Sequence, residues 1–350
     1  MIWLDSFPLD YAKKAALLRA AKDPYLLAER AEAFLPHEEG AAGKVFEKML
    51  SSLDSADYMK GLLASYEKKE IVCVTCFSEH YPEALRNIPD PPLVLYCRGN
   101  VRLLSERKFA IVGSRKTDAD IFARTEEISR GLSRCFAIVT GIAEGGDTAA
   151  VRGALESGKI ISVLAYGLDH VYPAVNRDLL KKIAKNGLLV SEYIPSRKSE
   201  PYLFPARNRI IAGLSEGVLV VSGGEKSGTR ITARLAYEYG RDVFAFPYGI
   251  GSRTGAGCNR LIKEYAKLTE ELVDITSAFG INLTEKEEIE LTENEKKALS
   301  AIGETPTHIS AIAEKAGLSV SSVQVCLTML EMKKAVVSCG GNRYAAIRRP

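Results

Sequence analysis

Phe109-Ala110-Ile111-Val112-Gly113-Ser114-Arg115 is the stretch that decides the fold of this chain. Four apolar residues give the pattern of a short buried strand, and a glycine, a hydroxyl and an arginine follow at once. A helical pattern over residues 121–135 comes next. A buried strand followed by a turn and a helix is the repeating unit of an α/β sheet, so this stretch predicts that fold class.

The same order of strand, turn and helix repeats along the chain. Because the strands are nearly all apolar, both faces of the sheet must be covered by helices, and we predict a doubly wound, mostly parallel sheet. In such a sheet ligands bind outside the carboxyl ends of the strands. The predicted strands are 109–112, 137–140, 160–164, 188–192, 218–222 and 243–246, and the predicted helices are 121–135, 148–157, 177–186, 207–214, 231–239 and 259–267.

Two smaller modules flank the α/β domain, which we assign to residues 67–275. Residues 1–66 carry apolar residues at helical spacing and predict a small helical module. Residues 276–291 are polar and acidic, as in a linker. Residues 292–350 predict a winged helix, for which binding to nucleic acid and docking to a protein both stay open.

The winged-helix prediction depends on a few local signals. Thr292-Glu293-Asn294-Glu295 has the pattern of a capping box and opens the first helix. A second helix is expected at about 309–315, and residues 316–319 turn into a third. The third helix should pack through Val320, Val323, Leu327 and Leu330, and a hairpin should join 335–338 to 343–346 through a turn at 340–342.

Composition sets the outer limits on function. The chain has 350 residues, 46% hydrophobic and 26% charged, as in an average globular protein. Its formal charge is only +3, so any binding to nucleic acid must use a local patch. No apolar stretch is long enough to span a membrane, and the seven cysteines fit reduced thiols, so we expect a cytoplasmic protein. Cys73 and Cys76 lack a second ligand pair, which favours plain thiols over a metal site.

Phosphate-binding chemistry recurs at the predicted strand ends. Gly113-Ser114-Arg115 and 140–147 follow two strands, and 223–230, which contains Ser227, Gly228 and Thr229, follows another. Glycine lets a phosphate approach the backbone, while hydroxyls and N–H groups donate to it. The alternative for a single turn is that Gly113 only shapes the backbone and Arg115 is a solvated charge. Several such turns together with Arg207-Asn208-Arg209 at a helix entrance favour an elongated phosphate-binding rim.

Other nucleotide-binding motifs fit poorly. The first turn lacks Gly-x-Gly-x-x-Gly, and 223–229 lacks the Gly-Lys-Ser/Thr of a P-loop. A catalytic constellation is also hard to assemble, because His170 is the one histidine near a predicted strand end. Asp147, Asp169 and Glu192 lie at strand ends too, which leaves acid–base work open, but helix capping and turn formation are the commoner roles for aspartates placed like Asp147 and Asp169. We predict no catalytic residues and no cofactor.

These motifs resemble the DNA-processing protein A (DprA/Smf) family. The resemblance covers about residues 70–275, and the string Phe-Pro-x-Arg-Asn-Arg-Ile-Ile-Ala-Gly-Leu at 204–214 is its most specific part. Other matching segments are 81–85, 90–93, 111–115, 172–176, 227–229, 232–233 and 259–262.

The resemblance implies an extended Rossmann-like domain that binds single-stranded DNA without sequence preference, forms a homodimer and loads the RecA recombinase in natural transformation. Small N-terminal helical, SAM-like modules and C-terminal winged helices also occur in the family. By position, the resemblance implies phosphate or DNA contacts from Gly113, Ser114, Arg115, Gly141, Arg177, Lys198, Arg207, Asn208, Arg209, Ser227, Gly228 and Thr229.

The chain departs from the family pattern at Gly146, Val151 and Ser222, where isoleucine, histidine and glutamate are usual. Two other function classes stay open. One is a nucleotide-processing enzyme of the phosphoribohydrolase-like class, whose Pro-Gly-Gly-x-Gly-Thr-x-x-Glu motif is only faintly similar to 223–229 and lacks the glutamate here. The other is a transcription regulator acting through the winged helix.

Overall fold

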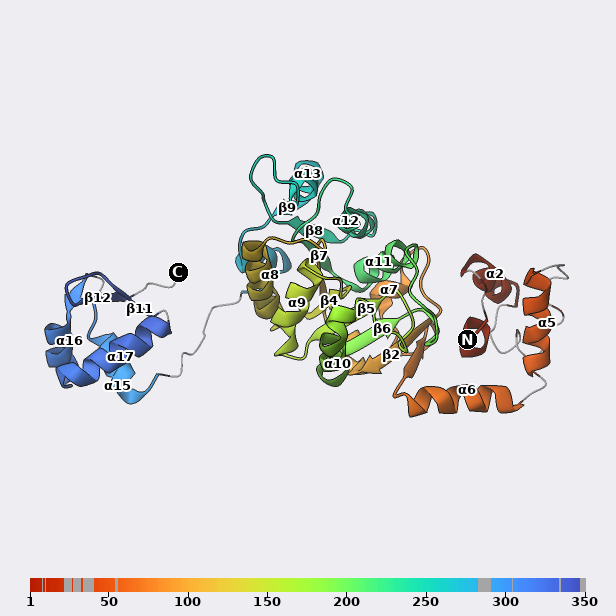
Figure 1. Ribbon diagram of the computed structural model, residues 1–350, viewed down its shortest axis with the longest axis horizontal. Coiled ribbons are helices and arrows are strands. Elements are labelled where there is room, and N and C mark those ends of the chain that lie inside the picture. Colours follow the sequence, from red (N-terminus) through yellow and green to blue (C-terminus); the bar gives the residue numbers. More distant parts are fainter. Residues whose placement is uncertain are drawn as a thin grey trace. The chain divides into compact units, whose positions relative to one another are not determined.

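The computed structural model describes residues 1–7, 9, 11–21, 27, 33, 41–53, 56–282, 291–303, 305–333 and 335–346 (Figure 1). They form two compact units, Met1–Ile281 and Asn282–Pro350. Among these residues, none of the helices is both long and apolar enough to cross a lipid bilayer.

The first unit is built on a nine-stranded sheet in the order β1-β2-β6-β5-β4-β3-β7-β8-β9. The strands from β6 to β9 run parallel, whereas β1 and β2 extend the sheet as antiparallel neighbours. The predicted mostly parallel sheet is therefore confirmed. Its strands are β1 (Val72–Thr75), β2 (Val94–Gly99), β3 (Lys108–Val112), β4 (Ala137–Thr140), β5 (Ile160–Leu164), β6 (Leu188–Ser191), β7 (Gly217–Val220), β8 (Asp242–Ala245) and β9 (Lys267–Leu268).

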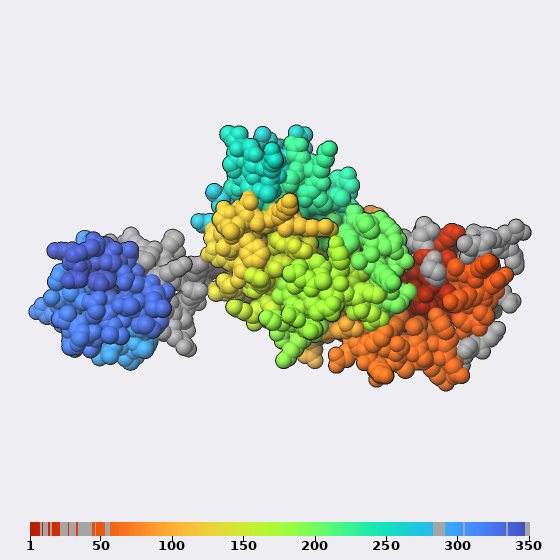
Figure 2. Space-filling model, viewed as in Figure 1, coloured from red at the N-terminus to blue at the C-terminus, as the bar shows by residue number. Residues whose placement is uncertain are grey.

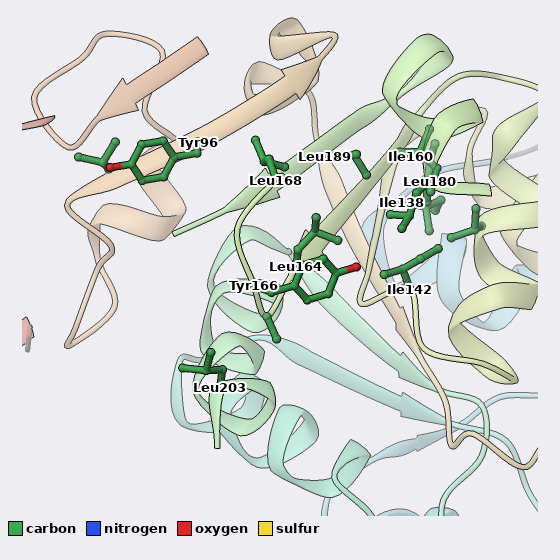
Figure 3. Close-up of a cluster of buried hydrophobic side chains, with 14 of the residues drawn as sticks. Tyr96, Ile138, Ile142, Ile160, Leu164, Tyr166, Leu168, Leu180, Leu189 and Leu203 are labelled. Atoms are coloured by element: carbon green, nitrogen blue, oxygen red, sulfur yellow. The ribbon is translucent and has the colours of Figure 1, made fainter. Parts of the chain in front are cut away.

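Successive residues of the central strands pack against opposite faces of the sheet, as the pleat requires. On β3, Phe109 and Ile111 belong to one hydrophobic core, while Ala110 and Val112 belong to a second. Figure 3 shows part of the first core, where side chains of β4, β5 and β6 gather with those of neighbouring loops. The apolar strands follow directly from having both faces buried.

Helices cover both faces (Figure 1). Helices α8 (Ala119–Leu132), α9 (Gly146–Leu155) and α10 (Arg177–Asn186) pack on the first core. Helices α7 (Glu83–Arg86), α11 (Leu203–Leu214), α12 (Thr229–Glu238) and α13 (Ala256–Glu264) pack on the second. Short elements complete the unit: η1 (Val101–Ser105), η2 (Ala174–Asn176), α14 (Leu272–Thr276) and η3 (Ser277–Phe279).

Five of these helices begin two to four residues before the predicted starts. Helix α11 begins at Leu203 and contains Pro205, and α12 begins at Thr229. Proline and turn-forming residues are tolerated in a first helical turn because its N–H groups need no partner within the helix. One expectation is corrected as a result. Arg207 is the fifth residue of α11, so it does not lie at the helix entrance.

The described N-terminal helices belong to the same compact unit as the sheet. A buried network joins them, in which Lys14 Nζ lies 2.8 Å from Asp5 Oδ1 and the Tyr96 hydroxyl of β2 donates to Asp5 Oδ2 at 2.8 Å. Trp3 and Leu4 extend the first core beside this network. The helices are α1 (Ile2–Asp5), α2 (Tyr11–Ala21), α5 (Ala41–Leu53) and α6 (Ala56–Lys68).

The second unit is a winged helix, as predicted. The capping box is present, because Thr292 Oγ1 accepts from Glu295 N at 3.3 Å and Glu295 Oε2 accepts from Thr292 N at 2.6 Å. Val323 is buried in this small core, but Val320 is 50% exposed and does not pack there as expected. The elements are α15 (Glu293–Ser300), β10 (Thr307–His308), α16 (Ile309–Ala316), α17 (Val320–Met332), β11 (Val336–Ser338) and β12 (Arg343–Ala346).

Candidate phosphate-binding pocket

A pocket of about 350 Å³ opens at the carboxyl end of β3. The strand order places β3 between β4 and β7, so the loops after these strands diverge to the two sides of β3. Such a switch point leaves a crevice in which α/β proteins bind ligands. We call this the switch-point pocket; its lining residues are Val112, Gly113, Ser114, Arg115, Ala143, Asp147, Phe204, Pro205, Arg207, Asn208, Ile211, Ser227, Gly228, Thr229 and Thr232.

The first turn presents Arg115 to this pocket. Ser114 is fixed by its backbone, since its N–H donates to Ser222 Oγ at 3.0 Å, and its hydroxyl donates to Lys116 O at 2.5 Å. Arg115 is exposed, and its guanidinium has no hydrogen bond or ion pair within the described part of the chain. Ser222, where the family pattern has glutamate, therefore holds the turn in place, and the Arg115 side chain stays exposed at the pocket.

The second turn is a tight loop around the carboxylate of Asp147. Asp147 Oδ1 accepts from Gly113 N and Oδ2 accepts from Ala143 N, each at 3.1 Å. Ile142 in this loop has a φ of 63°, which is unusual and strained for a β-branched residue. Asn176 stabilises the strained segment by donating from Nδ2 to Ile142 O at 2.9 Å.

Arg207 packs against the same loop. Its side chain is buried, and Nη1 donates to Gly141 O at 3.0 Å and to Val163 O. A Cβ on Gly141 would lie 2.5 Å from Arg207 Nη2, so only glycine leaves room for the guanidinium. Burial lowers the pKa of Arg207 and raises that of Asp147, and the opposite charge of each group counteracts the shift of the other. The Arg207 guanidinium therefore donates hydrogen bonds to carbonyl oxygens inside the protein.

The third turn joins the pocket through Asn208. Asn208 Nδ2 donates to Gly228 O at 3.4 Å, and Thr229 Oγ1 donates to Ser227 Oγ at 2.9 Å. Thr229 is the first residue of α12, so the start of this helix lies at the pocket wall. N–H groups in a first helical turn suit an anion.

Eight of the twelve candidate residues line this pocket, and four do not. Arg209 is buried, with Nη2 2.5 Å from Glu192 Oε2 and Nε 2.8 Å from Asp90 Oδ2. Burial acts to lower the pKa of Arg209, but these two carboxylates raise it above its ordinary value. Arg209 lies outside the pocket because it is two residues after Arg207, and residues two apart on a helix point to different faces. Gly141 lies behind the pocket against Arg207, Arg177 lines a different groove, and Lys198 is exposed elsewhere.

Sequence reasoning missed the roles of Asp147 and Asn176. Asp147 lies in the first turn of α9, as its helix-opening position predicts, and its carboxylate also joins the first and second turns. Gly146, a departure from the family pattern, also has a steric role, since a Cβ there would lie 2.5 Å from Gly113 Cα. The sequence signal for this close backbone approach was the presence of glycines, Gly113 and Gly146, in the turns that follow two neighbouring strands.

Comparisons with known proteins agree with this architecture. A profile of the family described as DNA recombination-mediator protein A matches residues 72–280, and a profile of the DprA winged helix domain matches 284–342. The DNA processing protein DprA of Streptococcus pneumoniae is 39% identical over 236 residues, covering 67% of this chain and 82% of that protein. The DprA of Bacillus subtilis is 41% identical over 220 residues, covering 61% and 73%.

Two solved structures are similar to this one. The X-ray structure of DNA processing protein A from Streptococcus pneumoniae has a TM-score of 0.69 at 34% identity and covers 79% of this chain and 95% of that chain. The second is the structure of DNA processing protein A from Helicobacter pylori, with a TM-score of 0.55 at 32% identity. That structure was described for the unique single-stranded DNA binding mode of the Helicobacter protein. It covers 59% of this chain and 95% of that chain.

Proposed function

The chain belongs to the DNA recombination-mediator protein A family, and from this premise we propose that it binds single-stranded DNA in the switch-point pocket. The observation that carries the proposal is that Arg115, an exposed arginine without a protein partner among the described residues, lines the same pocket as Thr229, the first residue of α12. A guanidinium and helical N–H groups facing one pocket are suited to a phosphate.

Aromatic side chains at the pocket favour an unpaired strand as the ligand. Phe204 lines the pocket, and Tyr172 packs edge-on against it with ring centroids 5.4 Å apart. Tyr202, two residues before Phe204, is 60% exposed. Bases can stack on exposed rings whatever their identity, and phosphate contacts carry no sequence information. The expected binding is therefore independent of sequence.

We also propose that the chain acts without catalysis, through Gly113, Ser114, Arg115, Asn208, Ser227, Gly228 and Thr229. Both oxygens of Asp147, the acid that lines the pocket, already accept backbone hydrogen bonds. An acid held in this way supports the loop and is poorly placed to exchange protons with a ligand. This arrangement speaks against the phosphoribohydrolase-like alternative.

Further parts of the proposal concern partners. A recombination mediator delivers DNA to a recombinase, so we propose that this chain acts as a homodimer in the cytoplasm and loads RecA onto single strands during natural transformation. Family membership supports this proposal. It is tested by the rate of RecA filament growth on a single strand with and without the chain, where no acceleration would count against it.

The DNA-binding proposal is tested by fluorescence anisotropy with labelled single strands of several sequences and with a matched duplex, over a salt series. We expect similar affinity for all single strands, weaker binding to the duplex and a steep salt dependence. Incubation with AMP is the companion experiment. Release of free base, or preference for one duplex sequence, would contradict the proposal and support the enzyme or the transcription regulator.

A further inference from the structure

A second, larger and more basic groove lies beside α10. It has a volume of about 780 Å³ and is walled by α10, the end of α6, β2 and the loop after β5. Figure 2 shows the surface of α6 and its following segment, in orange, beside the light-green surface that includes α10. We call it the α10 groove; its cationic lining residues are Lys68, Lys69, Arg98, Arg177, Lys181 and Lys185, against one acidic residue, Glu70.

Several of these charges are available to a ligand. Lys69 pairs with Asp169 at 2.7 Å, and Lys181 pairs with Asp178 at 3.5 Å on an exposed helix face. Lys68, Arg177 and Lys185 have no carboxylate partner in the part of the chain that the structure describes. A chain with a formal charge of only +3 therefore gathers unpaired positive charge in one hollow. Such a concentration attracts a polyanion.

The floor of the groove is apolar. Leu164, Leu168, Leu180 and Leu189 line it, and Figure 3 shows them in the same buried cluster as Tyr166. Arg98 is fixed at the wall, where Nη1 donates to Leu168 O at 2.9 Å. A buried apolar floor with cations along the rim suits a ligand that has both anionic and apolar parts, as a nucleotide chain has.

Two aromatic side chains link this groove to the switch-point pocket. His170 and Val171 line the groove, and the next residue, Tyr172, is 39% exposed. Tyr172 contacts Phe204, which lines the switch-point pocket. One exposed ring, that of Tyr172, and one partly buried ring, that of Phe204, thus lie between two sites suited to phosphates. This continuity favours one strand over an acidic protein segment as the occupant.

We propose that the α10 groove is a second phosphate-binding site, which takes the continuation of the single strand that leaves the switch-point pocket across Tyr172. The proposal rests on the proposed function, because it extends the same ligand. Lys181 and Lys185 lie one helical turn apart on α10 and contact successive phosphates of the strand, while Arg177 holds the strand nearest to Tyr172.

The test compares oligo-dT of about 6 and about 20 nucleotides, one near the lower end of the usual range of single-site footprints and one above that range. The variant is Lys181→Ala/Lys185→Ala. The matched control is Lys182→Ala, which removes an exposed lysine of the same helix that does not line the groove. We expect the double variant to bind the long strand about tenfold more weakly and to lower its salt slope by about 1.4, as for two lost phosphate contacts. The short strand and the control should bind as the unchanged protein does.

The outcomes separate this inference from the proposed function. If Arg115→Ala weakens both strands but the double variant binds the long strand normally, the α10 groove assignment is overturned and the proposed function stands. If the unchanged protein binds neither strand, both are overturned. Polyglutamate serves as the acidic-protein probe. One further outcome would assign the groove to an acidic protein segment. In it, the unchanged protein binds polyglutamate, and the double variant no longer binds polyglutamate but still binds the long strand normally.

Discussion

The first βα turn and helix α11 both bring arginines to the switch-point pocket region, but they use them in opposite ways. Arg115 is exposed and has no partner among the described residues, whereas Arg207 is buried and donates to the carbonyl oxygens of Gly141 and Val163. Arg209 is held by Glu192 and Asp90. One of these arginines is therefore exposed, and in our proposal it meets the ligand, while the other two make their contacts inside the fold.

Asp147→Ala should have the largest effect, because it removes the carboxylate that supports the buried Arg207. This change leaves Arg207 buried without its counter-charge and the N–H groups of Gly113 and Ala143 without their acceptor. We expect the free energy of unfolding to fall by about 3–5 kcal/mol, measured by urea denaturation. Asp178→Ala, an exposed change on α10, is the control. A loss of under about 1 kcal/mol would show that Arg207 does not depend on this carboxylate.

Arg209→Ala should also act on stability. It removes the partner of Glu192, which is largely buried, and of the more exposed Asp90. We expect a loss of about 2–4 kcal/mol in unfolding free energy, with unchanged affinity of the folded protein for oligo-dT. Arg209→Lys retains the charge and should recover part of the loss. A variant that folds normally but binds DNA weakly would place Arg209 among the ligand contacts.

Gly141→Ala tests how closely Arg207 is fitted. The new Cβ would lie 2.5 Å from Arg207 Nη2 and 2.7 Å from Asp147 Oδ2. Overpacking of this kind should destabilise the protein by about 1–3 kcal/mol, seen as a lower midpoint of thermal unfolding. Gly228→Ala is the matched control, since open space surrounds that position. Equal midpoints for the two variants would contradict the tight fit.

Arg115→Ala should give the smallest effect, and it should appear in binding alone. Because the side chain is exposed, stability should change by less than about 0.5 kcal/mol. Affinity for single strands should fall about tenfold, equivalent to about 1.4 kcal/mol, with the salt slope lower by about 0.7. The control is Arg102→Ala, an exposed arginine that precedes β3 and so lies near the opposite end of that strand. Equal losses in both variants would indicate only a general charge effect.

Much of the fold was predictable because strand periodicity is a local signal. The six predicted strands match β3 to β8 within two residues, since each is an apolar run with both faces buried. The two antiparallel strands β1 and β2 were not predicted as part of the sheet. Their pairing with each other and with β6 depends on distant contacts that no short window of sequence reveals.

The site was predictable only in part, for a similar reason. The sequence indicated which loops lie at strand ends, and the structure brings the first turn, the third turn and α11 to one pocket. It could not indicate that Arg207 turns inward while Arg115 stays exposed. That choice depends on the space beside Gly141 and on the acceptors at Gly141 and Val163, which exist only once the sheet has formed.

The most direct test of the central claim is the structure of this chain with bound oligo-dT. We expect a phosphate within hydrogen-bond distance of the Arg115 guanidinium and the first turn of α12, with Arg207 still donating to Gly141 and Arg209 still paired with Glu192. A strand that runs over another face, with the switch-point pocket unoccupied, would contradict the account.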